Sequence, residues 1–156
     1  MVVLTVAALL AALSGAAFAA TLSGTPEMDH LMGTARADTI RGMGGGDALH
    51  GMGGNDTLYG DAGSDGLYGG PGDDTVHGGP GDDRAEERKV FGGSGNDFLY
   101  GDAGSDALNA GPGNDTIFSE GDGEADVVDC GSGTDTVMKN GQEQLDSYVG
   151  CERFAR

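Results

Sequence analysis

The sequence predicts an all-β protein, a right-handed parallel β-solenoid built from nine-residue repeats. Residues 24–140 repeat the form Gly-Gly-x-Gly-x-Asp-x-U-x, where U is a large aliphatic residue, and residues 51–59 are its clearest copy. From Asp38 to Asp83 the repeated Asp residues stand nine apart, and U follows each of them as far as Asp74 by two. A nonapeptide of this form is typical of parallel β-helices, in which short strands alternate with turns.

The composition is unusual for a globular domain, with 32 Gly residues and 26 acidic against 8 basic residues, a formal net charge of −18. Gly loses the most backbone entropy on folding, and clustered carboxylates repel one another. Without a counter-ion we therefore expect disorder, and we expect a multivalent cation to remove the obstacle to folding. Nucleic acid is not expected as a partner, because little in the chain neutralises phosphates.

Residues 1–20 are typical of a secretory signal peptide. An apolar run at 2–13 is followed by Ala17-Phe18-Ala19, a cleavage site that places the mature start near Ala20. The usual basic segment before the apolar run is missing, which leaves open a start upstream of Met1. The alternative is an uncleaved anchor, but the run is shorter than a membrane-spanning helix needs. We expect a secreted, extracellular protein with no membrane insertion after cleavage.

The remaining chain divides into four parts. Residues 21–32 are a degenerate first repeat and N-terminal cap, 33–91 are a first repeat block, 92–138 are a second block, and 139–156 are a C-terminal cap. The five extra residues 84–88 interrupt the first block. We expect them to loop out, because Val90 then keeps the U position and the repeat resumes in register.

Each unit is expected to hold a three-residue strand, x-U-x, and a six-residue turn. Neighbouring side chains of a strand point to opposite faces, so U faces inward. Two units make a coil of 18 residues, and stacked coils place Asp56 beside Asp38. The residue before each repeated Asp is expected to adopt the left-handed conformation, which Asn and Asp tolerate. These residues are Asn55, Asp73, Asp82, Asn96 and Asn114.

Stacked turns would present two carboxylates and several backbone carbonyls to one cleft. Calcium takes six to eight such oxygens at flexible geometry, whereas magnesium demands a tighter octahedron. No His or Cys recurs with the period, which argues against an array of transition-metal sites. Because no such site exists in the unfolded chain, the free energy of calcium binding would be folding free energy.

These units resemble the RTX (hemolysin-type) calcium-binding repeats, which form a parallel β-roll with calcium between adjacent turns. The resemblance covers residues 24–138 and is strongest at 51–59, 69–77 and 92–100. It implies that the Asp at the sixth position of each unit is a calcium ligand. Carried over, the ligands are Asp38, Asp47, Asp56, Asp65, Asp74, Asp83, Asp97, Asp106 and Asp115, and less clearly Asp126 and Asp135.

The number of ions depends on the insertion. If residues 84–88 loop out, Asp pairs two units apart give about seven sites, and if they break the stack about five remain, so we expect about 4 to 8 calcium ions. The N-terminal signal and the two cysteines are similar to small stand-alone secreted members of the family. A detached fragment of a larger exported enzyme is an alternative.

Cys130 and Cys151 are the only cysteines, and an even number in an exported chain favours a disulfide. It would close a loop of about 21 residues and stabilise the C-terminal cap by roughly 3 kcal/mol. Two free thiols are the alternative.

Nothing in the chain predicts catalysis. There is no Gly-x-Ser-x-Gly or His-Glu-x-x-His motif, and the three His residues fall at outward or non-equivalent repeat positions. An alternative function is a calcium-dependent surface adhesin or interaction module that binds a glycan or protein through one outer face. That face would carry Thr57, Tyr59, Thr75, His77, Tyr100 and Thr116. The other interpretation of these residues is outward strand positions filled by good β-formers.

Overall fold

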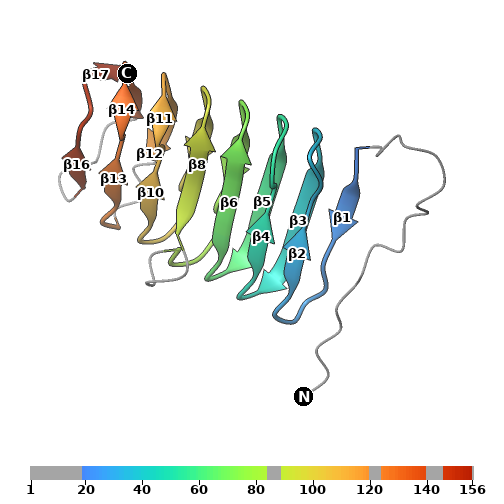
Figure 1. Cartoon of the computed structure of the whole chain (residues 1–156). Coiled ribbons are helices and arrows are strands. Elements are labelled where there is room, and N and C mark those ends of the chain that lie inside the picture. The colour runs from blue at the N-terminus through green and yellow to red at the C-terminus, as the bar shows by residue number, and fades with distance from the viewer. Residues whose placement is uncertain (1–18, 84–88, 120–123, 140–145, 156) are drawn as a thin grey trace.

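The computed structural model describes residues 19–83, 89–119, 124–139 and 146–155. In Figure 1 these residues form a row of stacked coils that runs from β1 at one end to β16 and β17 at the other. The architecture is the predicted all-β, right-handed parallel solenoid. The described part contains no helix long and apolar enough to cross a membrane. The signal-peptide prediction falls almost wholly on residues outside this part.

Two parallel sheets form the walls of the solenoid. The first has eight strands in the order β1-β3-β5-β7-β9-β12-β15-β17. They are β1 (Thr21–Ser23), β3 (Thr39–Gly45), β5 (Thr57–Gly63), β7 (Thr75–His77), β9 (Phe98–Tyr100), β12 (Thr116–Ser119), β15 (Thr136–Lys139) and β17 (Arg153–Ala155).

The second sheet has seven strands in the order β16-β13-β10-β8-β6-β4-β2. They are β2 (His30–Met32), β4 (Ala48–His50), β6 (Gly66–Pro71), β8 (Val90–Ser94), β10 (Ala107–Asn109), β13 (Val127–Asp129) and β16 (Ser147–Val149). A two-stranded sheet joins β11 (Pro112–Gly113) to β14 (Ser132–Gly133). Each coil therefore passes once through each wall.

The core is the row of U side chains, as predicted. Ile40 pairs in register with Leu58 in one sheet, and Leu49 pairs with Leu67 in the other. The fully buried members are Ile40, Leu49, Leu58, Leu67, Val76, Val90, Leu99, Leu108, Ile117, Val128 and Val137. Their strand neighbours, apart from the buried Gly66, are exposed or half-buried, so the inward and outward alternation holds on both walls.

The register across the insertion is also confirmed. Leu67 pairs with Val90 and Tyr68 with Phe91, so the repeat resumes with Val90 at the U position. A second shift of two residues separates Thr116 from its partner Thr136. Residues 84–88 themselves lie outside the described residues. The stack of coils is therefore continuous through both irregularities. Of the two alternatives for the insertion, the one in which it leaves the stack unbroken is correct.

Two local predictions were wrong. Strands are not confined to three residues per unit, because β3 and β5 each have seven and continue into the turn. There the turn backbones lie side by side and pair, for example Gly44 with Ala62.

The residues before the repeated Asp do not adopt the left-handed conformation either. Positive φ occurs instead at the second position of the unit, at Met43, Met52, Asp61, Asp102 and several glycines, and at glycines of the fourth position such as Gly54. Asn55, Asp73 and Asn96 have another role, because each side chain accepts a hydrogen bond from the next coil. Asp73 N donates to Asn55 Oδ1 at 3.3 Å, and Asn96 N to Asp73 Oδ1 at 2.7 Å.

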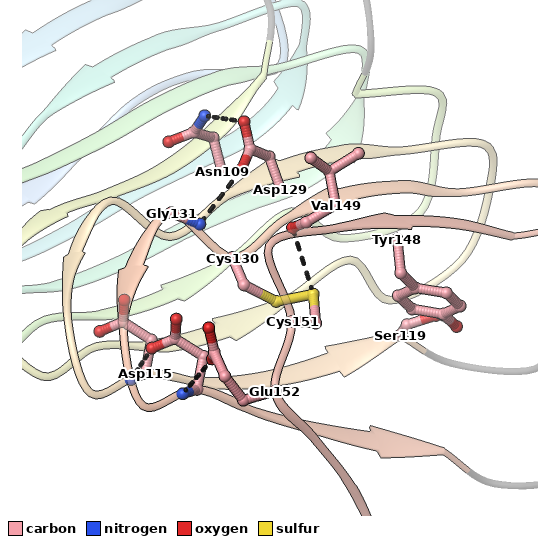
Figure 2. The surroundings of a disulfide bond; sticks show 11 residues. Asn109, Asp115, Ser119, Asp129, Cys130, Gly131, Tyr148, Val149, Cys151 and Glu152 are labelled. Atoms are coloured by element: carbon pink, nitrogen blue, oxygen red, sulfur yellow. Dashed lines mark hydrogen bonds between the residues drawn. A yellow bond between two sulfur atoms is a disulfide. The ribbon is translucent and has the colours of Figure 1, made fainter.

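The predicted disulfide is present at the C-terminal end of the stack (Figure 2). Cys130 and Cys151 have Cα atoms 5.2 Å apart and are separated by 21 residues. Cys130 is fully buried at the position where earlier units have their first Gly. The bond ties the end of β13 to the segment between β16 and β17, so it closes the last coil covalently.

Candidate metal centre

The repeated Asp side chains point into the coils and form two continuous ladders. In each step the backbone N–H of one Asp donates to Oδ1 of the Asp in the next coil, as from Asp38 to Asp56 at 2.7 Å. One ladder contains Asp38, Asp56, Asp74, Asp97, Asp115 and Asp135. The other contains Asp29, Asp47, Asp65, Asp83, Asp106, Asp126 and Asp146. All eleven predicted ligands therefore belong to one of two edges of the roll.

At six interior positions the second carboxylate oxygen has no hydrogen-bond donor. The Oδ2 atoms concerned include those of Asp56, Asp74, Asp83, Asp97, Asp115 and Asp135, and all are buried. These side chains are at most 2 % exposed, so water does not replace the missing donor at the surface. A buried charged acceptor without a donor costs more than the roughly 1–3 kcal/mol of a neutral one.

Carbonyl oxygens of the next coil face the same place. A Cβ on Gly92 would lie 2.5 Å from Asp97 Oδ2 and 2.7 Å from the Ala110 carbonyl oxygen. These two oxygens, 2.5 and 2.7 Å from the same point, are therefore at most 5.2 Å apart. The same combination of Oδ2 and carbonyl oxygen recurs at Gly33, Gly51 and Gly69. Because this Gly has no side chain, space remains between the two acceptor oxygens. These oxygens repel one another unless a cation lies between them.

Burial also shifts the acidity of these groups. Desolvation raises the pKa of Asp83 and Asp97 to about 7, although the backbone hydrogen bond to each carboxylate opposes the shift. It raises the pKa of Asp56, Asp74 and Asp115 to about 6, against the same opposing bond. Neighbouring carboxylates add to each rise. The interior turns therefore hold carboxylates that need either a proton or a cation.

The donor set fits calcium. At Gly51, Gly69 and Gly92 the oxygens that face the space are those of a carboxylate and a carbonyl group, which are the hard ligands that calcium prefers. Among the described residues no three His, Cys, Asp or Glu side chains gather tightly enough to hold a metal by themselves. Backbone carbonyl oxygens would therefore have to complete the coordination of the ion. This is the combination expected from the sequence, with two carboxylates and several carbonyls in each cleft.

The terminal coils differ from the interior ones. Asp29 Oδ2 accepts hydrogen bonds from Thr25 N at 2.6 Å and Thr25 Oγ1 at 2.9 Å. Asp38 Oδ2 accepts one from Thr34 N at 2.5 Å. At both positions a neighbouring Thr supplies the hydrogen that the interior carboxylates lack.

The same is true at the other end. Asp146 Oδ2 accepts hydrogen bonds from the hydroxyl groups of Ser119 and Tyr148, both at 2.9 Å. Figure 2 shows Ser119 and Tyr148 side by side next to the disulfide. The carboxylate of this last coil is therefore satisfied by protein groups.

Three ladder residues were missed among the predicted ligands. Asp29 precedes Asp38 by nine residues and Leu31 by two, and Asp146 precedes Tyr148 by two, so the period could have included both. Glu152 ends one ladder by accepting a hydrogen bond from Asp135 N at 3.0 Å. It stands 17 residues after Asp135 and breaks the period, so no sequence signal marked it.

The proposed outer face lies on the eight-stranded sheet, where Thr57 pairs with Thr75 and Tyr59 with His77. Its aromatic rings stack on one another: Tyr59 on His77 at 5.1 Å, His77 on Tyr100 at 4.1 Å and Tyr100 on Phe118 at 4.3 Å between ring centres. Thr116 pairs with Phe98 in the row of Thr57 and Thr75. All six residues of that prediction thus share one wall.

A parallel solenoid whose turns gather buried carboxylates and carbonyl oxygens defines the class of cation-binding β-rolls. The family model of the RTX calcium-binding nonapeptide repeat (4 copies) matches residues 23–58, 50–85 and 89–118. These matches cover more than half of the chain, which therefore belongs to this calcium-binding family. Neither a curated protein nor a solved structure gives a match.

Proposed function

We propose that this chain is a secreted, non-enzymatic protein that folds into its β-roll on binding several calcium ions. The observation that carries the proposal is the row of buried Oδ2 atoms without donors, which at Asp56, Asp74, Asp83 and Asp97 face a carbonyl oxygen of the next coil. A divalent cation between them would convert repulsion between acceptors into attraction. It would also offset part of the net charge of −18.

The proposed ligands are the interior members of the two ladders. They are Asp47, Asp56, Asp65, Asp74, Asp83, Asp97, Asp106, Asp115, Asp126 and Asp135, together with backbone carbonyls. Asp38 belongs with the terminal coils, because Thr34 N already donates to its Oδ2. The continuous stack supports a number near the upper part of the expected range of about 4 to 8 ions.

Secretion is supported by the apolar N-terminal run with its Ala17-Phe18-Ala19 site and by the disulfide. Disulfides persist in oxidising compartments. Extracellular fluids also commonly supply calcium at millimolar levels, a range in which extracellular calcium modules bind.

The test is far-UV circular dichroism of the chain without residues 1–19, titrated with calcium and separately with magnesium. We expect a cooperative transition from coil to β-structure with calcium, and little change at equal concentrations of magnesium, because magnesium dehydrates reluctantly. A chain already folded in chelator, or one unchanged by millimolar calcium, would contradict the proposal.

A second candidate is a calcium-dependent adhesin or interaction module. The specific support is an in-register row of Thr residues on the eight-stranded sheet, with Thr39, Thr57 and Thr75 paired in succession. Phe98 interrupts this row and is 46 % exposed. Substituting Thr57, Tyr59 and Thr75 together should abolish binding to immobilised glycans or cell surfaces while calcium-dependent folding persists. Unchanged binding, or none by the parent chain, would reject this candidate.

A further inference from the structure

Sulfur and imidazole side chains gather on the outside of the seven-stranded sheet at its N-terminal edge. We call Met28, His30, Met32 and His50 the His/Met patch. His30 and Met32 are the outward residues of β2, and His50 is the outward residue of β4 beside Met32. Met28 precedes His30 by two residues and is 69 % exposed, whereas the intervening Asp29 is buried. The patch therefore presents soft ligands with the nearest ladder carboxylate turned inward.

The two imidazoles are at a separation that a shared metal ion requires. The ring centres of His30 and His50 are 5.3 Å apart. An ion bound to both rings at roughly 2.0–2.1 Å would hold the ring centres about 5–6 Å apart. His30 stands over Ala48 in the sheet register, so no large neighbour prevents its ring from turning toward His50.

The two rings differ in how firmly they are held: that of His50 is fixed by stacking, whereas that of His30 is exposed and can rotate. The ring of His50 stacks on Tyr68 at 4.7 Å with the planes 3° apart, and Tyr68 stacks on Phe91. His30 is exposed on an edge strand and contacts His50 edge to face at 67°. Met32 flanks His50 on the side opposite Tyr68, because the register runs Met32, His50, Tyr68.

We propose that the His/Met patch is a binding site for copper, in particular Cu(I), separate from the calcium-binding turns. Thioether sulfur selects Cu(I) over hard cations, and imidazole binds copper in either oxidation state. Calcium prefers oxygen and should not compete here.

The test is anaerobic titration of the calcium-loaded chain with Cu(I) against a chromogenic Cu(I) chelator. We expect one Cu(I) per chain, with His30→Ala and His50→Ala each weakening the affinity by about tenfold or more. Met32→Leu should weaken it by a smaller factor, since it keeps the shape and removes only the sulfur. His77→Ala is the matched control, because His77 also lies in an aromatic stack but on the other sheet.

Calcium-induced circular dichroism should be the same in all four variants, which separates a failure of this site from a failure of calcium-dependent folding. If His50→Ala folds poorly, His30→Ala alone decides the matter, since His30 is exposed. The proposal is overturned if the chain binds no Cu(I), or if His77→Ala weakens binding as much as His30→Ala. Zinc binding that depends on both His residues without any Cu(I) binding would also overturn it.

Discussion

The interior and the terminal coils of this protein contain the same buried Asp in the same ladder but satisfy it differently. In the two N-terminal units the second residue is Thr25 or Thr34, which does not have positive φ and donates its N–H to the carboxylate. In six interior units the second residue has positive φ, and Oδ2 is left without a donor. The interior pairs are Met52–Asp56, Gly70–Asp74, Gly79–Asp83, Gly93–Asp97, Gly111–Asp115 and Gly131–Asp135.

The difference has a physical origin in the side chain at that second position. A β-branched residue such as Thr disfavours positive φ, whereas Gly adopts it freely. The backbone conformation then decides whether the carboxylate receives a proton donor from its own turn or is left to a cation. The N-terminal end of the roll is therefore closed by hydrogen bonds from its own turns, while these interior carboxylates are left to a cation.

Exchanging the second residue should have the largest effect. Gly93→Thr would require positive φ of a β-branched residue and would drive its Cβ into the Gly70 carbonyl. We expect loss of the calcium-induced β transition in circular dichroism. The reciprocal Thr34→Gly should leave the roll folded and add about one calcium to the stoichiometry measured by calorimetry. A Gly93→Thr chain that folds normally with calcium would contradict this account of the two regions.

Low pH should stabilise the metal-free roll in part, because protons then neutralise the interior carboxylates that calcium would otherwise neutralise. Each raised pKa means that the folded state binds more protons than the unfolded state between about pH 4 and pH 7. The free energy of unfolding of the metal-free roll therefore falls as pH rises through this window, by up to roughly 4 kcal/mol per shifted carboxyl. Metal-free chain should show more β-structure at pH 4.5 than at pH 8, by circular dichroism in chelator. More β-structure at pH 8 would show that the interior carboxylates are not the controlling groups.

Removing the disulfide tests the covalent part of the C-terminal closure. Cys130→Ala with Cys151→Ala reproduces the Ala110 unit one coil earlier, where Ala already occupies the first position. We expect a loss of roughly 3 kcal/mol, following the entropy of a 21-residue loop. Hydrogen exchange should localise the loss to β13–β17 and leave β3–β9 protected. Equal loss of protection along the whole roll would reject a local role.

Neutralising a single carboxylate should have the smallest effect on folding. The effect on calcium binding should differ between the interior and the terminal coils. Asp97→Asn takes a proposed interior ligand away, so calcium affinity should fall by about tenfold, while chelator-treated protein gains β-structure because the amide supplies a donor. Asp146→Asn should leave calcium stoichiometry unchanged, because Ser119 and Tyr148 already satisfy that carboxylate. Calorimetry on both variants gives the comparison. If the two variants lost calcium to a similar extent, the proposed difference between the terminal and the interior coils would be wrong.

Much of this arrangement could be predicted because a short period repeats itself. The U positions from Ile40 to Val137, the pairing of residues 18 apart and the return to register at Val90 all follow from counting, and the structure confirms them. The nine-residue period did not predict features that depend on the shape of the turns. It could not show that the turn backbones pair, since hydrogen bonds between turns depend on their shape.

The period also concealed the role of Asn55 and Asp73. A local preference for left-handed φ suggested one role, but the stack offered their side chains a backbone N–H of the next coil. Contacts between coils thus overrode a local propensity. Glu152 is the clearest example, because it takes the place of a ladder Asp only through the path of the last coil.

By itself the sequence determined the solenoid, its inward aliphatic row and the identity of the repeated acids, because these are properties of a periodic chain in which each unit resembles the next. Only the tertiary structure decided which carboxylates receive hydrogen bonds from Thr25, Thr34, Ser119 and Tyr148 and which are left facing carbonyl oxygens. It also brought His30 to His50 across neighbouring coils. These relations join residues about one coil or more apart or depend on a turn's backbone angle, and a linear pattern specifies neither.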